Sequence, residues 1–355
     1  MRVVASRLAS SDLPARGASR TTVRLALTDE DGRVGLGEAT PLPPFSRDDG
    51  PSAVRALHAI HARLADVDDG DPVRAISFEI QRIFVVAPSA RFALETALLD
   101  LAAQRRALSL AELLGGPRPY REVALNGLLV ADPLADLADR AVALAAKGRR
   151  ALKIKLRARD AAAFARELAA LREVRRRLPL PYEIRLDPNA AWTDDEARAR
   201  LAALASIAPR FVEQPVAPER LPALGPCAAP WAADESLAIP GLARALLDAP
   251  GCVAFILKPH LLGLVRARAL AVRAQERGLD VVVTHLFDGP VAMAAACELA
   301  LSLPRAPLAC GLDPHDLLAS FPPLRIPQLA PRAVIAPAAS PGLGFPREGA
   351  LAWTA

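Results

Sequence analysis

The sequence predicts an α/β protein in which a parallel (β/α) barrel follows a smaller α+β unit. From about residue 121 onward, eight short apolar stretches alternate with helical stretches, as they do in a barrel. Before that point, strand-like residues come first and helices follow. Charged residues also stand at the ends of successive apolar stretches, where barrel enzymes carry their active sites. A doubly wound sheet is the alternative, but no GxGxxG turn follows a first strand.

The length of 355 residues, of which 52% are hydrophobic, suits one large domain with a smaller one attached. No apolar run approaches the roughly 18–20 residues of a membrane span. The N-terminus lacks the long apolar core and small-residue cleavage site of a secretory signal. We therefore expect a cytoplasmic protein that does not insert into a membrane. The four cysteines form no CxxC pair, so we expect reduced thiols.

The net charge of +5 raises the question of nucleic-acid binding. The basic residues are scattered among acidic ones, however, and only 4% of the residues are aromatic and able to stack on bases. We therefore expect a small-molecule partner and no nucleic acid. The sequence leaves open whether the chain forms a homo-oligomer.

The first unit, residues 1–120, has the pattern of an α+β capping domain. Its expected elements are two strands around a turn, a Pro-rich loop and two helices: Thr22–Leu27, the turn at Asp31-Gly32, Arg33–Gly37, the loop with Phe45, Ser52–Leu64 and Ala90–Leu114.

The second unit, residues 121–319, carries the barrel pattern. The expected strands are Val123–Leu128, Ala151–Leu156, Glu183–Leu186, Phe211–Val212, Trp231–Ala233, Val253–Leu257, Asp280–Val283 and Pro307–Cys310. The expected helices are Leu134–Lys147, Ala161–Leu178, Asp194–Leu204, Gly241–Asp248, Leu264–Arg277 and Val291–Leu303. A Pro-rich tail, residues 320–355, lacks a clear helix, and we expect it to return to the first unit.

Lysine is scarce in this chain, with only four among 44 basic residues. Arginine keeps its proton in proteins, whereas lysine can lose its proton when its pKa is lowered. Three of the four lysines, Lys153, Lys155 and Lys258, stand at the ends of expected strands, which makes them candidates for proton chemistry. Chance is the simpler explanation, and it weakens with each lysine at such a position. Lys147 falls at a helix end, where a cation is favourable by itself.

Three carboxylates end three consecutive expected strands, at Asp187, Glu213 and Asp234. Each could simply cap the helix that follows. Three in register, with lysines on the strands before and after them, instead predict one cluster at the barrel mouth. Oxygen ligands of this kind suit Mg²⁺, with Mn²⁺ as the alternative.

Lysines beside a bound divalent cation predict proton abstraction next to a carboxylate. Such a proton is weakly acidic because its removal adds a second negative charge, which a metal ion stabilises in the resulting enediolate. A lysine with cationic neighbours, here Lys153 and the metal, can act as the base near neutral pH.

The order of motifs Lys153-Ile154-Lys155, Asp187-Pro188-Asn189, Glu213-Gln214-Pro215, Asp234-Glu235-Ser236 and Lys258-Pro259 resembles the muconate-lactonising subgroup of the enolase superfamily, over nearly the whole chain. The resemblance implies an enolase-like modified (β/α)7β TIM-type barrel with an α+β capping domain made from the N-terminal part and the tail. It implies metal ligands Asp187, Glu213 and Asp234. It also implies catalytic residues Lys155 and Lys258 on opposite faces of the substrate, with Lys153 beside them.

Further motifs look like those of the o-succinylbenzoate synthase family, at Gly35–Ala39 with Pro41-Leu42-Pro43, at Arg91–Ala97, Leu125–Leu128, Thr284–Pro290 and Gly311–Asp313. The implied reaction is syn-dehydration of 2-succinyl-6-hydroxy-2,4-cyclohexadiene-1-carboxylate through an enediolate, in menaquinone biosynthesis. Lys155 would remove the α-proton and Lys258 would stabilise the enediolate. Residues expected to bind substrate or orient the site are Asn189, Gln214, Glu235, Ser236, Asn126, Thr284, Gly311 and Phe45.

Other reactions of the same superfamily stay open. An N-acylamino acid racemase would use the same two lysines, one for each face, and a muconate cycloisomerase is a further possibility. Mandelate-racemase-like chemistry would use His285, but Lys258 occupies the place of its acidic partner. Dipeptide epimerases show an acidic DxD near the eighth strand, where this chain has Asp313-Pro314-His315-Asp316. A barrel that binds a ligand without catalysis is the remaining alternative, although no charged site residue is missing.

Overall fold

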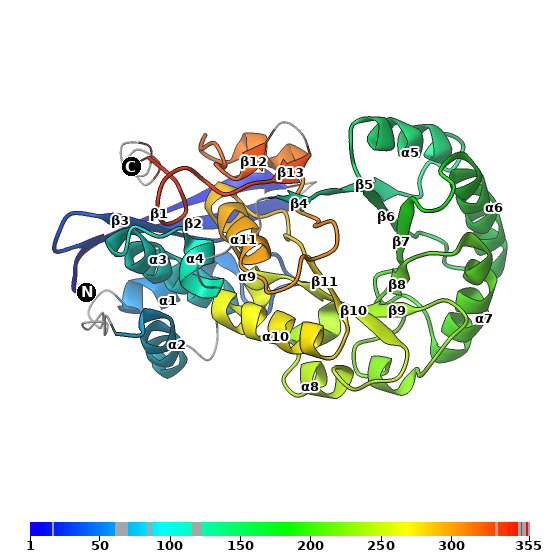
Figure 1. Ribbon diagram of the computed structural model, residues 1–355, viewed down its shortest axis with the longest axis horizontal. Coiled ribbons are helices and arrows are strands. Elements are labelled where there is room, and N and C mark those ends of the chain that lie inside the picture. The colour runs from blue at the N-terminus through cyan, green and yellow to red at the C-terminus, as the bar shows by residue number, and fades with distance from the viewer. Residues whose placement is uncertain are drawn as a thin grey trace.

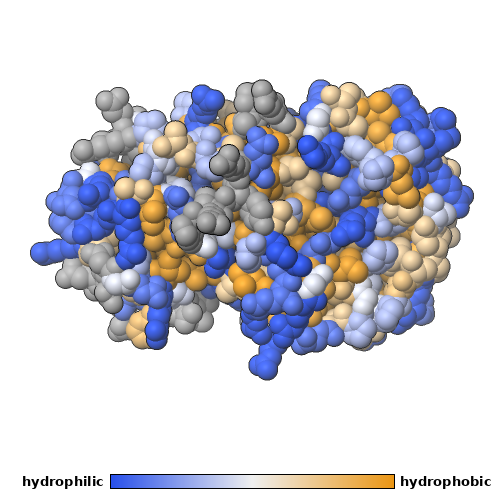
Figure 2. Space-filling model, viewed as in Figure 1, coloured by the Kyte–Doolittle hydropathy of each residue, from blue (hydrophilic) through white to orange (hydrophobic). Residues whose placement is uncertain are grey.

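The computed structural model describes residues 1–15, 18–60, 70–83, 87–115, 122–330, 333–346, 349 and 353. A three-stranded antiparallel sheet with its helices forms one end of the molecule, and a curved parallel sheet with helices outside it forms the other (Figure 1). On the face in Figure 2, hydrophobic residues show mostly over the middle and hydrophilic residues gather toward the outer rim of the barrel. Within the described residues, no helix combines the length and the apolar character that a membrane crossing needs.

The N-terminal unit begins with the strands β1 (Val3–Ala15), β2 (Ala18–Asp29) and β3 (Val34–Ala39), paired antiparallel in that order. The helices that follow are α1 (Gly50–Ile60), α2 (Pro72–Ile83), α3 (Pro88–Arg105) and α4 (Leu110–Gly115). The strand β1 and the helix α2 were not among the predicted elements. The predicted helix at Ser52–Leu64 is present as α1, and its last four residues lie outside the described residues.

The prediction of one helix over Ala90–Leu114 is wrong, because the chain breaks between α3 and α4. Ala107 has a positive φ of 54°, and Leu108 N donates to Ala103 O, which closes the end of α3. Ser109 then starts α4 by exchanging hydrogen bonds with Glu112. Apolar periodicity alone did not reveal this break.

Glycines allow α3 to pack very close to β3. A Cβ added at Gly37 would lie 1.9 Å from Ala93 O, and one at Gly35 would lie 2.2 Å from Ala97 O. No side chain fits in that space, so the Gly-x-Gly pattern of β3 fixes the distance between helix and sheet.

The barrel strands run parallel and pair in chain order: β5 (Asn126–Val130), β6 (Ala151–Lys155), β7 (Glu183–Asp187), β8 (Phe211–Glu213), β9 (Trp231–Ala233), β10 (Cys252–Leu257) and β11 (Asp280–Val283). The helices between and after them are α5 (Leu137–Ala146), α6 (Ala161–Arg177), α7 (Asp194–Leu204), α8 (Leu242–Leu246), α9 (Pro259–Leu262), α10 (Leu264–Glu276) and α11 (Pro290–Leu301). Each agrees with a predicted element to within a few residues, except α9, which was not predicted.

The barrel closes without a regular eighth strand, which corrects the prediction for Pro307–Cys310. Single bridges join Cys310 to Leu125 and Gly311 to Thr284. The hydrogen bonds that close the gap run from Asn126 N to Cys310 O, 2.9 Å, and from Gly311 N to Val283 O, 2.9 Å. Pro307 has no amide hydrogen, which removes one donor from this segment.

The predicted first barrel strand, Val123–Leu128, is divided between two sheets. Its start, β4 (Val123–Ala124), pairs antiparallel with β13 (Val334–Ile335), which in turn pairs with β12 (Leu329–Ala330). Only the residues from Asn126 onward, in β5, belong to the barrel. No local pattern indicated this division, because the partner strands lie about 200 residues farther along the chain.

The tail lies against the N-terminal unit. Leu343 N donates to Asp100 Oδ1 of α3, 2.8 Å, and Gly342 pairs with Ser109 in a single bridge. Arg24 of β2 donates to the carbonyl oxygen of Trp353. These contacts join the two ends of the chain around α3.

A buried arginine lies inside the barrel among apolar side chains. Arg185, 1% exposed, lies over the ring of Phe211, with 5.4 Å between its Cζ and the ring centre. Its Nη1 donates to Ala309 O, 2.7 Å, and to Asn126 Oδ1, 3.4 Å. Arg185 therefore connects β7 across the interior to β5 and to the irregular segment that closes the barrel.

We expect Arg185→Met to lower the free energy of unfolding by about 3 kcal/mol, because the carbonyl of Ala309, the amide oxygen of Asn126 and the carboxylate of Glu183 lose their donor. Arg210→Met is the matched control, since Arg210 pairs with Asp280 while its side chain is 48% exposed. That surface pair should contribute less than about 1 kcal/mol. Urea unfolding followed by circular dichroism measures both values, and equal losses would contradict the role assigned to Arg185.

Candidate active site

Three carboxylates come together at the carboxyl ends of neighbouring barrel strands. Asp187 ends β7, Glu213 ends β8, and Asp234 directly follows β9. Their exposed fractions are 0%, 2% and 3%, respectively. Burial of three like charges side by side is unfavourable unless cations lie beside them.

Lysine ammonium groups supply that positive charge. Lys153 Nζ lies 2.8 Å from Asp187 Oδ2 and 2.5 Å from Glu213 Oε1. Lys258 Nζ lies 2.5 Å from Asp234 Oδ2. The predicted cluster of Asp187, Glu213 and Asp234 with lysines on both sides is therefore assembled in the structure.

The pKa values in the cluster follow from burial and from these contacts. Burial raises the pKa of Glu213 well above its ordinary value, and Asp187 and Asp234 add to the effect while Lys153 opposes it. Burial also disfavours the charge on Asp234, but Lys258, Glu213 and Lys153 together outweigh it and the pKa of Asp234 is lowered. The three carboxylates raise the pKa of Lys153 despite its burial.

Lys258 keeps its proton for the same reason. Its burial opposes the charge, but Asp234 and then Glu235 raise its pKa to about 12. Its ammonium group is therefore a permanent cation at neutral pH in this arrangement.

Lys155 differs from the other two lysines. It is paired in register with Asp187, yet within the described part of the chain its Nζ makes no hydrogen bond or ion pair. Burial lowers the pKa of Lys155, and the nearby ammonium groups of Lys153 and Lys258 lower it further. An unpaired lysine with a lowered pKa has the properties of a general base.

The predicted orienting residues hold the carboxylates in place. Asn189, in a left-handed conformation with φ 51°, donates from its backbone N to Asp187 Oδ1, 2.8 Å, and from Nδ2 to Asp187 Oδ2, 3.1 Å. Its Nδ2 also lies 3.4 Å from Glu235 Oε1. Asparagine accepts this backbone conformation more readily than most residues.

Gln214 and Ser236 form a second support. Gln214 Oε1 accepts from Asp234 N, 3.1 Å, and from Ser236 N, 3.2 Å, while its Nε2 donates to Ser236 Oγ, 2.8 Å. These bonds fix the turn after β9 and therefore the direction of Asp234. Both residues are fully buried, so neither can contact a substrate.

Asn126, Thr284 and Gly311 lie together where the barrel closes. Thr284 Oγ1 donates to Gly311 O, 3.0 Å, and a Cβ on Gly311 would lie 3.5 Å from Asn126 Oδ1. Asn126 Oδ1 already accepts from Arg185. Phe45 lies on the loop after β3 with 47% of its surface exposed, and its role as a substrate cover stays a prediction.

Sequence reasoning missed Leu128 as a site residue. It is paired in register with Lys153 and is 42% exposed, although it belongs to a barrel strand. The preceding residue, Gly127, faces the helices outside the barrel, because a Cβ there would lie 2.9 Å from Leu144 Cδ1 of α5. Leu128 therefore points to the same side as Asn126 and Lys153, which strand alternation could have revealed.

The donor set suits a hard divalent cation, because it offers carboxylate oxygens and no sulfur or nitrogen. Among the described residues, no group of three His, Cys, Asp or Glu side chains has the geometry of a metal cage. Instead, Lys153 Nζ contacts an oxygen of Asp187 and Lys258 Nζ contacts an oxygen of Asp234. The charge and chemistry of Asp187, Glu213 and Asp234 fit a metal ion.

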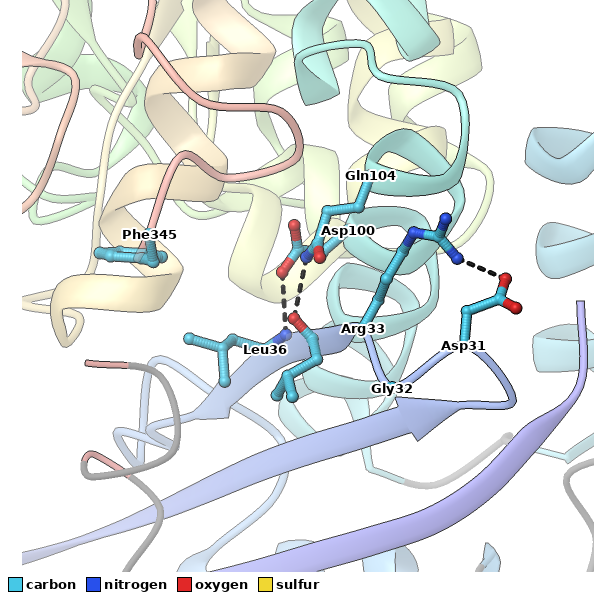
Figure 3. A pocket seen from close by; sticks show the side chains of 8 residues that line it. Asp31, Gly32, Arg33, Leu36, Asp100, Gln104 and Phe345 are labelled. Carbon is cyan, nitrogen blue, oxygen red and sulfur yellow. Dashed lines mark hydrogen bonds and ion pairs between the residues drawn. The ribbon is translucent and has the colours of Figure 1, made fainter. Parts of the chain in front are cut away.

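A cavity of about 150 Å³ lies away from this cluster, in the N-terminal unit (Figure 3). Its polar groups bond to one another. Asp100 Oδ2 accepts from Leu36 N, 3.0 Å, Gln104 Nε2 donates to Val34 O, 2.8 Å, and Arg33 is paired with Asp31. The cavity therefore offers no free catalytic group, and the strand ends remain the candidate active site.

Two family models match the chain. The N-terminal domain of the mandelate racemase/muconate lactonizing enzyme family matches residues 13–115, and the enolase C-terminal domain-like family matches residues 136–347.

Relatives with three different activities match at similar levels. A muconate cycloisomerase 1-2 of Acinetobacter lwoffii is 30% identical over 79% of this chain and 74% of its own. An L-Lys-D/L-Arg epimerase of Methylococcus capsulatus is 32% identical over 77% of each chain. An o-succinylbenzoate synthase of Desulfotalea psychrophila is 30% identical over 80% of this chain and 84% of its own.

The solved structure of a dipeptide epimerase from Methylococcus capsulatus, complexed with Mg and the dipeptide L-Arg-D-Lys, is 25% identical and covers 97% of this chain and 99% of its own, with a TM-score of 0.82. The predicted fold class, an enolase-like barrel with a capping domain, is confirmed by these matches.

We expect Lys155 to lose its proton at a lower pH than the other two barrel lysines. Selective ¹⁵N-lysine labelling gives only four Nζ signals, because the chain has four lysines. Single Lys→Arg variants assign the signals, and exposed Lys147 supplies the reference. In a pH titration, the Lys155 signal should change to that of an amine while Lys258, with a pKa raised to about 12, stays an ammonium. Titration of Lys155 together with Lys258, or above it, would contradict this assignment.

Proposed function

Because the chain belongs to the muconate-lactonising subgroup of the enolase superfamily, we propose that it removes a proton next to a substrate carboxylate, with Lys155 as the base. The observation that carries this proposal is the contrast among three lysines at one site. Lys153 and Lys258 are paired with carboxylates and have raised pKa values, whereas the pKa of Lys155 is lowered and its Nζ has no partner among the described residues. Of the three, Lys155 is the lysine best suited to accept a proton.

Asp187, Glu213 and Asp234 would hold Mg²⁺, or Mn²⁺ as the alternative. The bound ion would supply positive charge next to the substrate carboxylate, where negative charge develops. The Mg complex of the Methylococcus capsulatus epimerase supports this metal for the fold.

We propose o-succinylbenzoate synthase activity as the specific reaction. Lys155 Nζ takes the proton from the carbon next to the ring carboxylate. The C–O bond on the neighbouring carbon then breaks, and the leaving hydroxide receives the proton back from Lys155 and departs as water. Lys258 stays protonated throughout and stabilises the enediolate from the other face. The Desulfotalea psychrophila relative and the motifs around Thr284 and Gly311 support this choice.

The motifs that resemble the synthase family place dehydration ahead of racemization. A racemase needs a base on each face of the substrate, so its second lysine must be neutral in one direction. Lys155 and Lys258 are both present here, and the contact of Lys258 with Asp234 would change when Asp234 holds a metal ion. The N-acylamino acid racemase reaction is therefore the second candidate.

The eighth-strand loop argues against a dipeptide substrate with a free amino terminus. Asp313, the first of the two acids in this loop, is engaged by Arg149, from Nε to Oδ2 at 2.9 Å and from Nη2 to Oδ1 at 2.6 Å. A carboxylate already held by a bidentate arginine is a poor partner for a substrate ammonium group.

The cytoplasmic location and the assembly of the chain stay predictions.

We expect the protein with Mg²⁺ to dehydrate the cyclohexadiene carboxylate, followed by the change in absorbance. Lys155→Ala should lower kcat by about 10²-fold or more, because it removes the base. Lys147→Ala is the matched control and should keep the wild-type rate, since Lys147 is exposed outside the site. Removal of metal by a chelator should also abolish turnover, and added Mg²⁺ should restore it. Wild-type protein that only exchanges the α-proton of an N-succinylamino acid in heavy water would favour the racemase instead.

We expect the protein to discriminate against dipeptides with a free amino terminus. In heavy water, α-proton exchange measured by NMR should be faster for an N-succinylated amino acid than for an unmodified Ala-Glu dipeptide. Arg149→Met releases Asp313 and should raise exchange of the free dipeptide, by about tenfold if one charge-assisted contact forms. Rapid exchange of the free dipeptide by the wild-type protein would show that Asp313 does not set this preference.

A further inference from the structure

Arg20 of β2 joins two loops that are far apart in the sequence. It is 5% exposed, and its guanidinium donates to four backbone carbonyls. Two belong to the loop after β3, Thr40 O and Pro41 O, the latter at 3.2 Å from Nε. Two belong to the loop after β11, Leu286 O at 2.9 Å and Phe287 O at 2.5 Å from Nη1. One side chain therefore fixes the capping loop that carries Phe45 against the seventh loop of the barrel.

Asp288 extends this contact toward the sixth loop. Its Oδ1 accepts from Thr40 Oγ1, 3.1 Å, lies 2.7 Å from His260 Nδ1, and lies 3.7 Å from Arg20 Nη2. Its Oδ2 accepts from Leu286 N, 3.0 Å. Asp288 and His260 are 2% and 1% exposed, so the whole set is shielded from water. Buried hydrogen bonds of charged groups are directional and costly to break, which makes the set rigid.

His260 brings the connection to the catalytic lysine. It stands two residues after Lys258, in the short helix α9. Its ring stacks on Phe92 of α3 with 5.5 Å between ring centres and an angle of 8°. The helix α3 also contacts the start of the next helix, α10, because Glu95 Oε2 of α3 accepts from Leu264 N, 2.5 Å. The backbone that presents Lys258 is thus fixed by the N-terminal unit and by Asp288.

Arginine is needed at position 20 because of the number and spread of the acceptors. Its planar group offers five N–H donors in fixed directions, whereas a lysine has three donors at one point. No lysine could bond to two carbonyls of one loop and two of another.

We propose that Arg20 is a positioning residue that acts through Asp288 and His260 to hold Lys258 in its catalytic orientation, an inference that rests on the proposed role of Lys258. Arg20, Asp288 and His260 form one buried connection that ends at His260. Lys258 lies two residues before His260 in the sequence, nearer to it than any other residue of the site. Lys155, on β6, has no part in it.

The Nζ signals of ¹⁵N-labelled lysine test this connection without using activity. Arg20→Met should shift or broaden the Lys258 signal and leave the Lys153 signal unchanged. Arg24→Met is the matched control, because Arg24 stands on the same strand and donates to Trp353 O in the tail. It should leave all four signals in place. An unchanged Lys258 signal in Arg20→Met, or an equal shift of all the barrel lysines, would overturn the proposal.

Turnover of the cyclohexadiene carboxylate is the second measurement. Arg20→Met should lower kcat by about tenfold or more while KM and Mg²⁺ affinity stay near the wild-type values, because a misplaced catalytic group slows the chemical step. A shifted Lys258 signal with wild-type kcat would overturn the catalytic part of the proposal. If the wild-type protein does not turn this substrate over, the proposed function fails, and the NMR comparison still decides whether Arg20 positions Lys258.

His260→Phe provides a variant that keeps the ring stacked on Phe92 and removes the contacts of His260 Nδ1 with Asp288 and Thr40. It should reproduce the changed Lys258 signal and the lower kcat, which keeps the test decisive if Arg20→Met does not fold. Wild-type behaviour of His260→Phe in both measurements would overturn the proposed route through Asp288.

Discussion

The need to neutralise three buried carboxylates at one edge of the barrel governs the rest of this structure. Asp187, Glu213 and Asp234 lie almost without exposure, and no such group can stay ionised without a cation beside it. Lys153 and Lys258 supply that charge and are held by it. Burial and the same ammonium groups then lower the pKa of Lys155, whose Nζ has no partner within the described part of the chain. One electrostatic constraint thus produces both a cation site and a base.

The N-terminal unit holds the barrel helices through buried acids. Glu38 of β3 accepts from Val291 N and Ala292 N, both at 3.1 Å, at the start of α11. A Cβ at Gly289 would lie 2.0 Å from Glu38 Oε1, so a larger residue there would displace the Glu38 side chain. Glu95 Oε2 accepts in the same way from Leu264 N at the start of α10. These side-chain oxygens satisfy amide donors that helix starts leave free, and they connect the N-terminal unit to α10 and α11.

The relatives of this chain carry out different reactions on one scaffold, which is why the site and not the fold must decide the activity. The charged lysines and carboxylates are compatible with all three reactions. A contact that bears on the choice of substrate is the pairing of Asp313 with Arg149. It agrees with the proposed substrate, which has no free ammonium group.

The sequence by itself determined the strand order of the barrel and the charged residues at its strand ends, because strand alternation and β/α spacing are local properties. Asn189 and Gln214 were expected from the resemblance of their motifs, and their hydrogen bonds came from the structure. The break between α3 and α4 has a local sequence signal, the Ser109 and Glu112 capping pair, which apolar periodicity overlooks. Only the tertiary structure decided the division of the first barrel strand at Leu125 and the irregular closure at Cys310. It also decided which lysine is unpaired, and it revealed the contacts of Arg20 with Asp288, Leu286 and Phe287. These features depend on partners more than 180 residues away or on competition among neighbouring charges, and no local pattern records either.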